Sequence, residues 1–107
     1  MARKANPATD FEVTVEDIGL FTFARRTMAD EFAIQRKFTE LAGGGDNHTT
    51  WLELVGGWVS ALSVLTVRAP EGWDIATMDP LDDEVYAQLN KVYEALRGAE
   101  DSFRGKR

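Results

Sequence analysis

Cysteine is absent from the 107 residues of this chain, and histidine occurs only once, as His48. The missing thiols exclude disulfide frameworks, cysteine nucleophiles and cysteine zinc sites, and they favour a reducing compartment. A single histidine lacks the further imidazole or thiolate ligands that a zinc ion requires. We therefore expect neither a metal nor a cofactor.

Recognisable catalytic groupings are also missing. Catalysis needs a nucleophile with its base, an acid and base pair or a metal cage, and His48 has no such partner in its polar loop. The glycine run 43–45 is not followed by Lys-Ser or Lys-Thr, so it is not a phosphate-binding loop. Asp82 and Asp83 are adjacent carboxylates, but a helix start accounts for them. The sequence predicts a protein that binds other proteins, and not an enzyme.

Basic charge is scarce, since 12 Lys and Arg residues stand against 18 acidic ones and the net charge is −6. Nucleic-acid binding requires a surface that neutralises phosphates, so this balance argues against it. Residues 51–67 carry one charge, Glu53, but the run is shorter than the ~20 residues of a membrane span. No apolar stretch follows the basic start of the chain, so we expect a cytoplasmic protein without a secretory signal.

Period-two alternation predicts an N-terminal β-hairpin. Residues 11–15 alternate apolar and polar side chains, residues 16–19 supply a turn, and residues 20–24 form the returning strand. Gly19 is free to adopt a positive φ in that turn. Because two strands alone are marginal in water, the hairpin must lie on a helix or pair with another chain.

Two helices are predicted next, over residues 28–42 and 51–65. Thr27 and Asp30 form a capping box at the first start, the glycine run 43–45 ends that helix in a flexible loop, and Thr49 or Thr50 caps the second. The first carries an apolar face of Met28, Phe32, Ile34, Phe38 and Leu41. The second carries a broader one, the predicted centre of the core, of Trp51, Leu54, Val55, Trp58, Val59, Leu62 and Leu65.

Glycines 56 and 57 interrupt the second helix at a cost of about 1 kcal/mol each relative to alanine. A close crossing with another helix or the hairpin would offset that cost, and we favour it over a hinge.

An irregular stretch follows Val67, attached to the core by Trp73, Ile75 and Met78. Residues 71–84 hold six acidic residues and no basic one, without the spacing of an EF-hand. We assign Asp82 or Asp83 as a helix N-cap instead.

The last helix, over residues 82–103, has an apolar seam at steps of three and four: Val85, Leu89, Val92, Leu96, Ala99 and Phe103. Tyr86 and Tyr93 lie on one flank of it, near Asn90 and Arg97. Either the seam packs on the second helix with the tyrosines at its edge, or this flank forms an interface. The candidate partner-binding residues are Tyr86, Leu89, Asn90, Tyr93, Leu96, Arg97, Phe103 and, from the second helix, Trp58.

These patterns predict an α+β fold, mostly α, in which an N-terminal β-hairpin is followed by three helices packed in one small domain. The predicted organisation is a flexible N-terminal arm over residues 1–9, a single globular domain over 10–103 and a basic C-terminal tail over 104–107.

Short phrases carry a resemblance to a known family: Phe-Glu-Val-Thr-Val, Gly-Leu-Phe-Thr-Phe-Ala-Arg-Arg-Thr, Ala-Pro-Glu-Gly-Trp-Asp, Asp-Pro-Leu-Asp and Ser-Phe-Arg. In their order, residues 10–104 resemble the tail assembly chaperones encoded among the tail genes of long-tailed bacteriophages. The resemblance implies binding to the tape measure protein in the host cytoplasm, keeping it soluble, and helping tail tube proteins gather round it. It supplies no active-site residues.

Two other functions stay open. A minor tail protein, such as a completion or connector protein, would remain in the virion, and a host-directed inhibitor would bind its target through the acidic residues 71–84. Homo-oligomers are compatible with all three functions, because the hairpin edge and the last helix offer surfaces for self-association.

Overall fold

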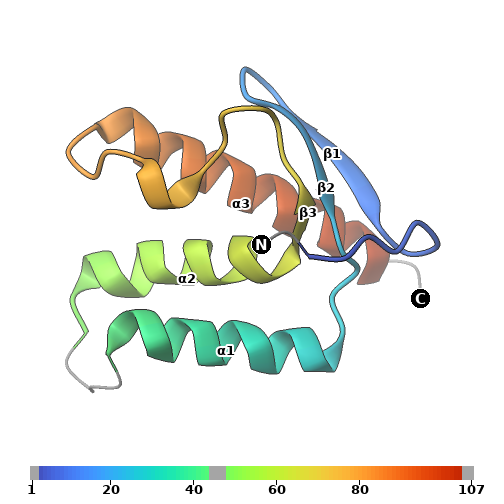
Figure 1. Ribbon diagram of the computed structural model, residues 1–107, viewed down its shortest axis with the longest axis horizontal. Coiled ribbons are helices and arrows are strands. Elements are labelled where there is room, and N and C mark those ends of the chain that lie inside the picture. The colour runs from blue at the N-terminus through green and yellow to red at the C-terminus, as the bar shows by residue number, and fades with distance from the viewer. Residues whose placement is uncertain (1–2, 44–47, 105–107) are drawn as a thin grey trace.

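The computed structural model describes residues 3–43 and 48–104. The elements in chain order are β1 (Phe11–Val15), β2 (Gly19–Phe23), α1 (Met28–Ala42), α2 (Thr50–Leu65), β3 (Thr66–Arg68), the short 3₁₀ helix η1 (Ile75–Thr77) and α3 (Asp83–Arg104). The sheet covers one end of the helical layer, in which α1 runs antiparallel to α2 and α3 runs beside α2 (Figure 1). The predicted α+β fold, with a hairpin and three helices in one small domain, is confirmed.

The hairpin pairs its strands with Phe11 opposite Phe23 and Val15 opposite Gly19. The turn requires glycine at position 19, where φ is 141°. A Cβ atom there would lie 2.6 Å from Cγ of Pro70, because the chain after β3 crosses the end of the hairpin at this point. The predicted turn is confirmed, and the returning strand begins at Gly19, one residue early.

A third strand, which the sequence analysis did not predict, completes the sheet. β3 follows α2 directly and pairs antiparallel with β2, with Thr22 opposite Arg68. The strand order is β1-β2-β3. The hairpin thus finds its pairing partner within its own chain. The stretch predicted to be irregular after Val67 also contains η1, whose start is capped by the Asp74 carboxylate accepting from the amide of Ala76 at 3.2 Å.

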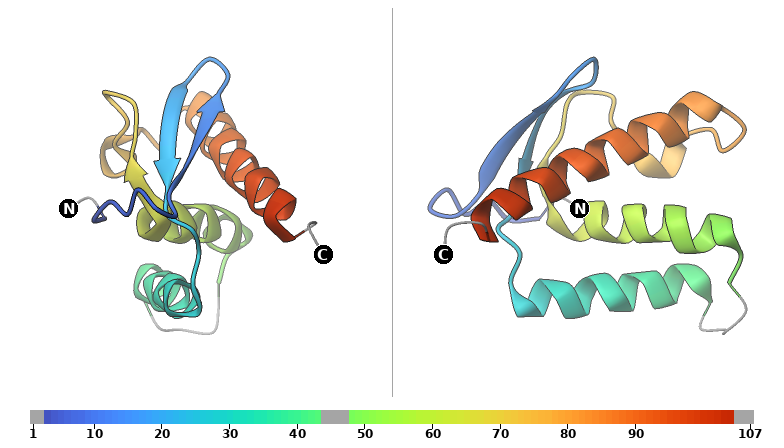
Figure 2. Two further views of the ribbon diagram at one scale, coloured as in Figure 1. Left: turned by 90° about the vertical axis from the view of Figure 1, so that its right-hand side faces the viewer. Right: turned by 180° about the vertical axis from the view of Figure 1, so that it is seen from behind.

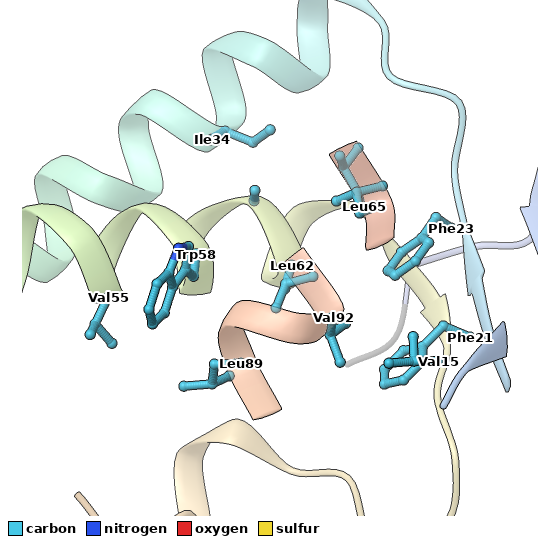
Figure 3. Close-up of a cluster of buried hydrophobic side chains, with 12 residues drawn as sticks. Val15, Phe21, Phe23, Ile34, Val55, Trp58, Leu62, Leu65, Leu89 and Val92 are labelled. Carbon is cyan, nitrogen blue, oxygen red and sulfur yellow. The ribbon is translucent and has the colours of Figure 1, made fainter. Parts of the chain in front are cut away.

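The core lies where α2 meets the sheet and α3. Its largest fully buried apolar side chains are Phe21, Phe23, Leu62, Leu65, Val92 and Leu96. Figure 3 shows side chains from β1, β2, α1, α2 and α3 meeting in this cluster. Trp73, Ile75 and Met78 pack against it as predicted.

Parts of the predicted apolar faces are outside the core. Met28 and Phe32 of α1 are 71% and 61% exposed, and Trp51 and Leu54 of α2 are 53% and 54% exposed. In α1, only the part of the apolar face around Ile34 is buried, because this helix packs chiefly against α2. The prediction that the whole apolar face of α2 centres the core is therefore wrong at Trp51 and Leu54.

The helix caps agree with the sequence. The Thr27 hydroxyl accepts from the amide of Asp30 at 3.2 Å, and the Asp30 carboxylate accepts from the amide of Thr27 at 2.9 Å. Thr49 caps α2. Gly43 ends α1 in the left-handed conformation with φ 75°. The rest of the predicted flexible loop, residues 44–47, lies outside the described residues.

Two carboxylates of residues 71–84 stabilise turns before α3 and at its start. The Asp79 and Asp82 carboxylates each accept an amide hydrogen bond at 2.9 Å, from Leu81 and Glu84 respectively. Within residues 3–43 and 48–104, no three His, Cys, Asp or Glu side chains gather closely enough to hold a metal ion. The described helices include none that is long and apolar enough to cross a membrane.

The two central glycines of α2 differ in their surroundings. A Cβ atom on Gly56 would lie 3.0 Å from Cε1 of Phe38, whereas a Cβ on Gly57 would meet nothing within 4 Å. The predicted close crossing is thus confirmed at Gly56 alone.

We expect Gly57→Ala to raise the free energy of unfolding by about 0.5–1 kcal/mol, because alanine is the better helix former and meets no clash. The free energy of unfolding of Gly56→Ala should be lower than that of Gly57→Ala, since the Phe38 ring must shift to admit the methyl group. Urea unfolding of the two variants checks this. Equal stabilisation by both would contradict the close packing of α1 on Gly56.

Candidate partner-binding groove

The structure divides the sequence-predicted binding residues into two groups. Three of them, Trp58, Leu89 and Leu96, are buried in the core, so a partner cannot reach them in this structure. The seam of α3 thus packs within its own chain, which is the first of the two arrangements considered from sequence. The accessible group consists of Tyr86, Asn90, Tyr93, Arg97 and Phe103. Asn90 is exposed, and the other four are half-buried.

A surface groove runs between α1 and α3, with α2 as its floor. Figure 2 shows, in its right-hand view, α3, α2 and α1 lying across this side of the molecule in that order. The residues lining the groove are Ile34, Gln35 and Phe38 from α1, Gly57, Ser60 and Ala61 from α2, and Tyr93 from α3, with Arg26 and Glu31 at one end. One of the two predicted tyrosines is therefore a wall of the groove.

Small residues form the floor. Gly57 has open space above it, Ala61 follows one helical turn later, and Ser60 turns its hydroxyl away to the carbonyl oxygen of Gly56 at 2.6 Å. Leu54 precedes Gly57 by three residues on the same side of α2 and is 54% exposed. A floor of this kind between Phe38 and Tyr93 can accept apolar side chains from outside.

The aromatic flank continues beyond the groove. Tyr86 packs edge-on against Trp51 of α2, with ring centroids 6.4 Å apart, and its hydroxyl donates to the carbonyl oxygen of Pro80. The ring contact holds the start of α3 against the start of α2, and the hydrogen bond attaches α3 to the turn that precedes it. Trp51 and Leu54, left outside the core, lie near the start of α2, whereas the groove lining on that helix begins at Gly57.

An ion network closes the end of the groove at Arg26. Arg26 donates two hydrogen bonds of 3.0 Å to Glu100 and one of 2.8 Å to Glu31, and Arg97 donates one of 2.7 Å to Glu100. Burial acts to lower the pKa of Arg26, but the hydrogen bonds and charges of Glu31 and Glu100 outweigh it and raise that pKa. The pKa of Glu31 is lowered by hydrogen bonds from Gln35 and Arg26. The network fixes the connection between β2 and α1 to both α1 and α3.

A second ion pair links the N-terminal segment to the helices. Arg3 donates from its guanidinium to the buried carboxylate of Asp30. Burial acts to raise the pKa of Asp30, but hydrogen bonds from Arg3 and Thr27 outweigh it and hold that pKa below its usual value. The flexibility predicted for residues 1–9 stays a prediction, and residues 1–2 and 105–107 lie outside the described residues.

The lowered pKa of Asp30 predicts an acid-sensitive contribution to stability. A carboxyl group whose folded pKa is depressed stabilises the fold above its unfolded pKa near 4, and the contribution is lost as pH falls through the folded pKa. We expect Asp30→Asn to cost about 1–2 kcal/mol at pH 7, through the cap and the Arg3 contact. Urea unfolding at pH 7 and pH 3 should show the difference from wild type shrinking at the lower pH. A difference independent of pH would contradict the charge-based origin.

The groove contains residues that the sequence analysis did not select. Gln35 and Gly57 are two of them. The pair of glycines in α2 predicts a helix crossing, which accounts for Gly56 but not for the open space above Gly57. The signal that was present is the run Leu54, Gly57 and Ala61 at helical spacing, which places small residues beside an apolar one on one face.

Comparison of the chain with protein-family models, with curated proteins and with solved structures finds no match, so a functional assignment depends on this groove and on the resemblance seen in the sequence.

Proposed function

We propose that this protein is a tail assembly chaperone of a long-tailed bacteriophage. It binds the tape measure protein in the host cytoplasm, keeps that protein soluble and assists assembly of the tail tube. The observation that supports this proposal is the open groove above Gly57, whose walls are Phe38 and Tyr93.

The geometry suits a helical partner. Amphipathic helices commonly bind by laying their apolar side chains, spaced at three and four residues, into a groove between two helices. Here the partner's side chains would cover Gly57 and Leu54, and the aromatic rings of Phe38 and Tyr93 would flank them. A long apolar helix aggregates unless its stripe is covered, so the groove would protect one segment of it. The net charge of −6 would help a crowded assembly stay soluble.

Co-expression tests the proposal. The tape measure protein encoded in the same genome should gain solubility in the presence of this protein and should co-purify with it. Absence of both effects would refute the proposed function. Mass spectrometry of purified virions separates the chaperone from a minor tail protein, because a chaperone should be missing from finished particles.

A further inference from the structure

A pocket rich in arginine lies where β2 leads into α1 and α3 ends. Its lining residues are Arg25, Arg26, Arg97, Glu100, Phe103 and Arg104. Four guanidinium groups and one carboxylate, that of Glu100, line the pocket, in a protein whose net charge is −6. Glu31 and Asp101 lie outside the lining and contact Arg26 and Arg104. The pocket concentrates positive charge on an otherwise acidic molecule.

Arg25 and Arg104 keep hydrogen-bond donors available for a ligand. The other two arginines of the pocket, Arg26 and Arg97, donate to Glu100, as described above. By contrast, the guanidinium carbon of Arg25 lies 4.0 Å above the ring of Phe103, and Arg25 forms no ion pair with any described residue. Arg104 approaches Asp101 only at 3.9 Å, and its side chain is 66% exposed. A planar guanidinium group without a close carboxylate partner can bind a carboxylate from another molecule through two parallel hydrogen bonds.

A complementary surface lies at the opposite end of α3. Residues 79–84 carry four carboxylates and no basic side chain, and Leu81 among them is 90% exposed. Asp83 and Glu84 form no ion pair with any described residue. At about 1.5 Å of rise per residue along α3, Glu84 lies roughly 20 Å from Arg97, where the pocket lining begins, and roughly 30 Å from Arg104. One molecule therefore cannot join its own two surfaces.

We propose that the acidic segment, residues 79–84, of one copy docks into the arginine pocket of a second copy. Asp83 and Glu84 bind the guanidinium groups of Arg25 and Arg104, and Leu81 packs beside Phe103. Since the two surfaces differ, the contact is head to tail, and each added copy leaves one pocket and one acidic segment free. The association is independent of the proposed groove function, because none of the residues that form this contact lines the groove.

Light scattering coupled to size-exclusion chromatography tests the association. At about 20 mM salt the average mass of the wild type should rise above 11.9 kDa with concentration, and at about 1 M salt it should return to that value. Arg25→Gln with Arg104→Gln should abolish the increase, as should Asp83→Asn with Glu84→Gln.

A mixture of the two double variants provides the decisive measurement. Each variant lacks one surface and keeps the other, so an equimolar mixture should form a one-to-one dimer that grows no further. Glu53→Gln with Glu94→Gln is the matched control, because it removes two exposed carboxylates outside both surfaces and should associate like wild type.

Three outcomes would overturn the proposal. One is a wild type that stays at 11.9 kDa at low salt throughout the concentration range. Another is a mixture that stays monomeric although circular dichroism shows both variants folded. The third is an arginine double variant whose mass still rises with concentration as that of the wild type does, but which no longer binds the tape measure protein. That result would assign the pocket to the tape measure protein.

Discussion

Phe21→Ala is expected to lower the free energy of unfolding by about 3–5 kcal/mol, the usual cost of emptying a large aromatic site in a core. Phe21 is fully buried. Its ring stacks on Phe23 at 5.7 Å between centroids and meets Trp73 edge-on at 5.1 Å. The side chain thus joins the sheet to the segment after β3, and truncation would loosen both. For a chain of this length, with a total stability of roughly 5–15 kcal/mol, the loss is a large share.

Phe32→Ala is the matched control, because it removes the same ring from a position that is 61% exposed. Its effect should stay within about 0.5 kcal/mol. Urea unfolding followed by tryptophan fluorescence measures both variants, and Trp73, one of the three tryptophans that contribute to the signal, contacts Phe21. Equal losses in the two variants would show that Phe21 is not the centre of the sheet's packing.

Local patterns were sufficient to predict the hairpin, the three helices and the caps. Alternation over residues 11–15 and the reciprocal bonding of Thr27 and Asp30 depend on near neighbours in sequence, which is why they could be read directly. β3 could not be predicted in this way. It has three residues, no turn residue separates it from α2, and its pairing with Thr22 joins positions far apart in the chain.

The site was predicted in part. The flank of Tyr86 and Tyr93 follows from helical spacing, and Tyr93 does line the groove. Periodicity cannot tell which part of a broad apolar stripe will be covered, because this depends on the angle and length of the neighbouring helices. For this reason helical spacing predicts partner contacts for Leu89 and Leu96, which belong to the core, and a core position for Leu54, which is exposed.

Filling the groove is expected to remove partner binding while leaving the fold intact. Gly57→Leu places a branched side chain in the open space between Phe38 and Tyr93, where the partner's apolar side chain would otherwise lie. Loss of a central, desolvated contact costs about 2–4 kcal/mol in a protein interface, which corresponds to a decrease in affinity of roughly 30-fold to 1000-fold. In co-expression, the tape measure protein should return to the insoluble fraction and should no longer co-purify.

Two variants separate this effect from unfolding and from added hydrophobicity. Gly57→Ala leaves most of the open space and should retain binding, with the small gain in stability predicted above. Ser63→Leu adds a leucine to an exposed position on another face of α2, so it should bind like wild type. Thermal unfolding of all three establishes that each is folded. If folded Gly57→Leu still solubilises the tape measure protein as wild type does, the groove is not where that partner binds, even if the chaperone function itself stands.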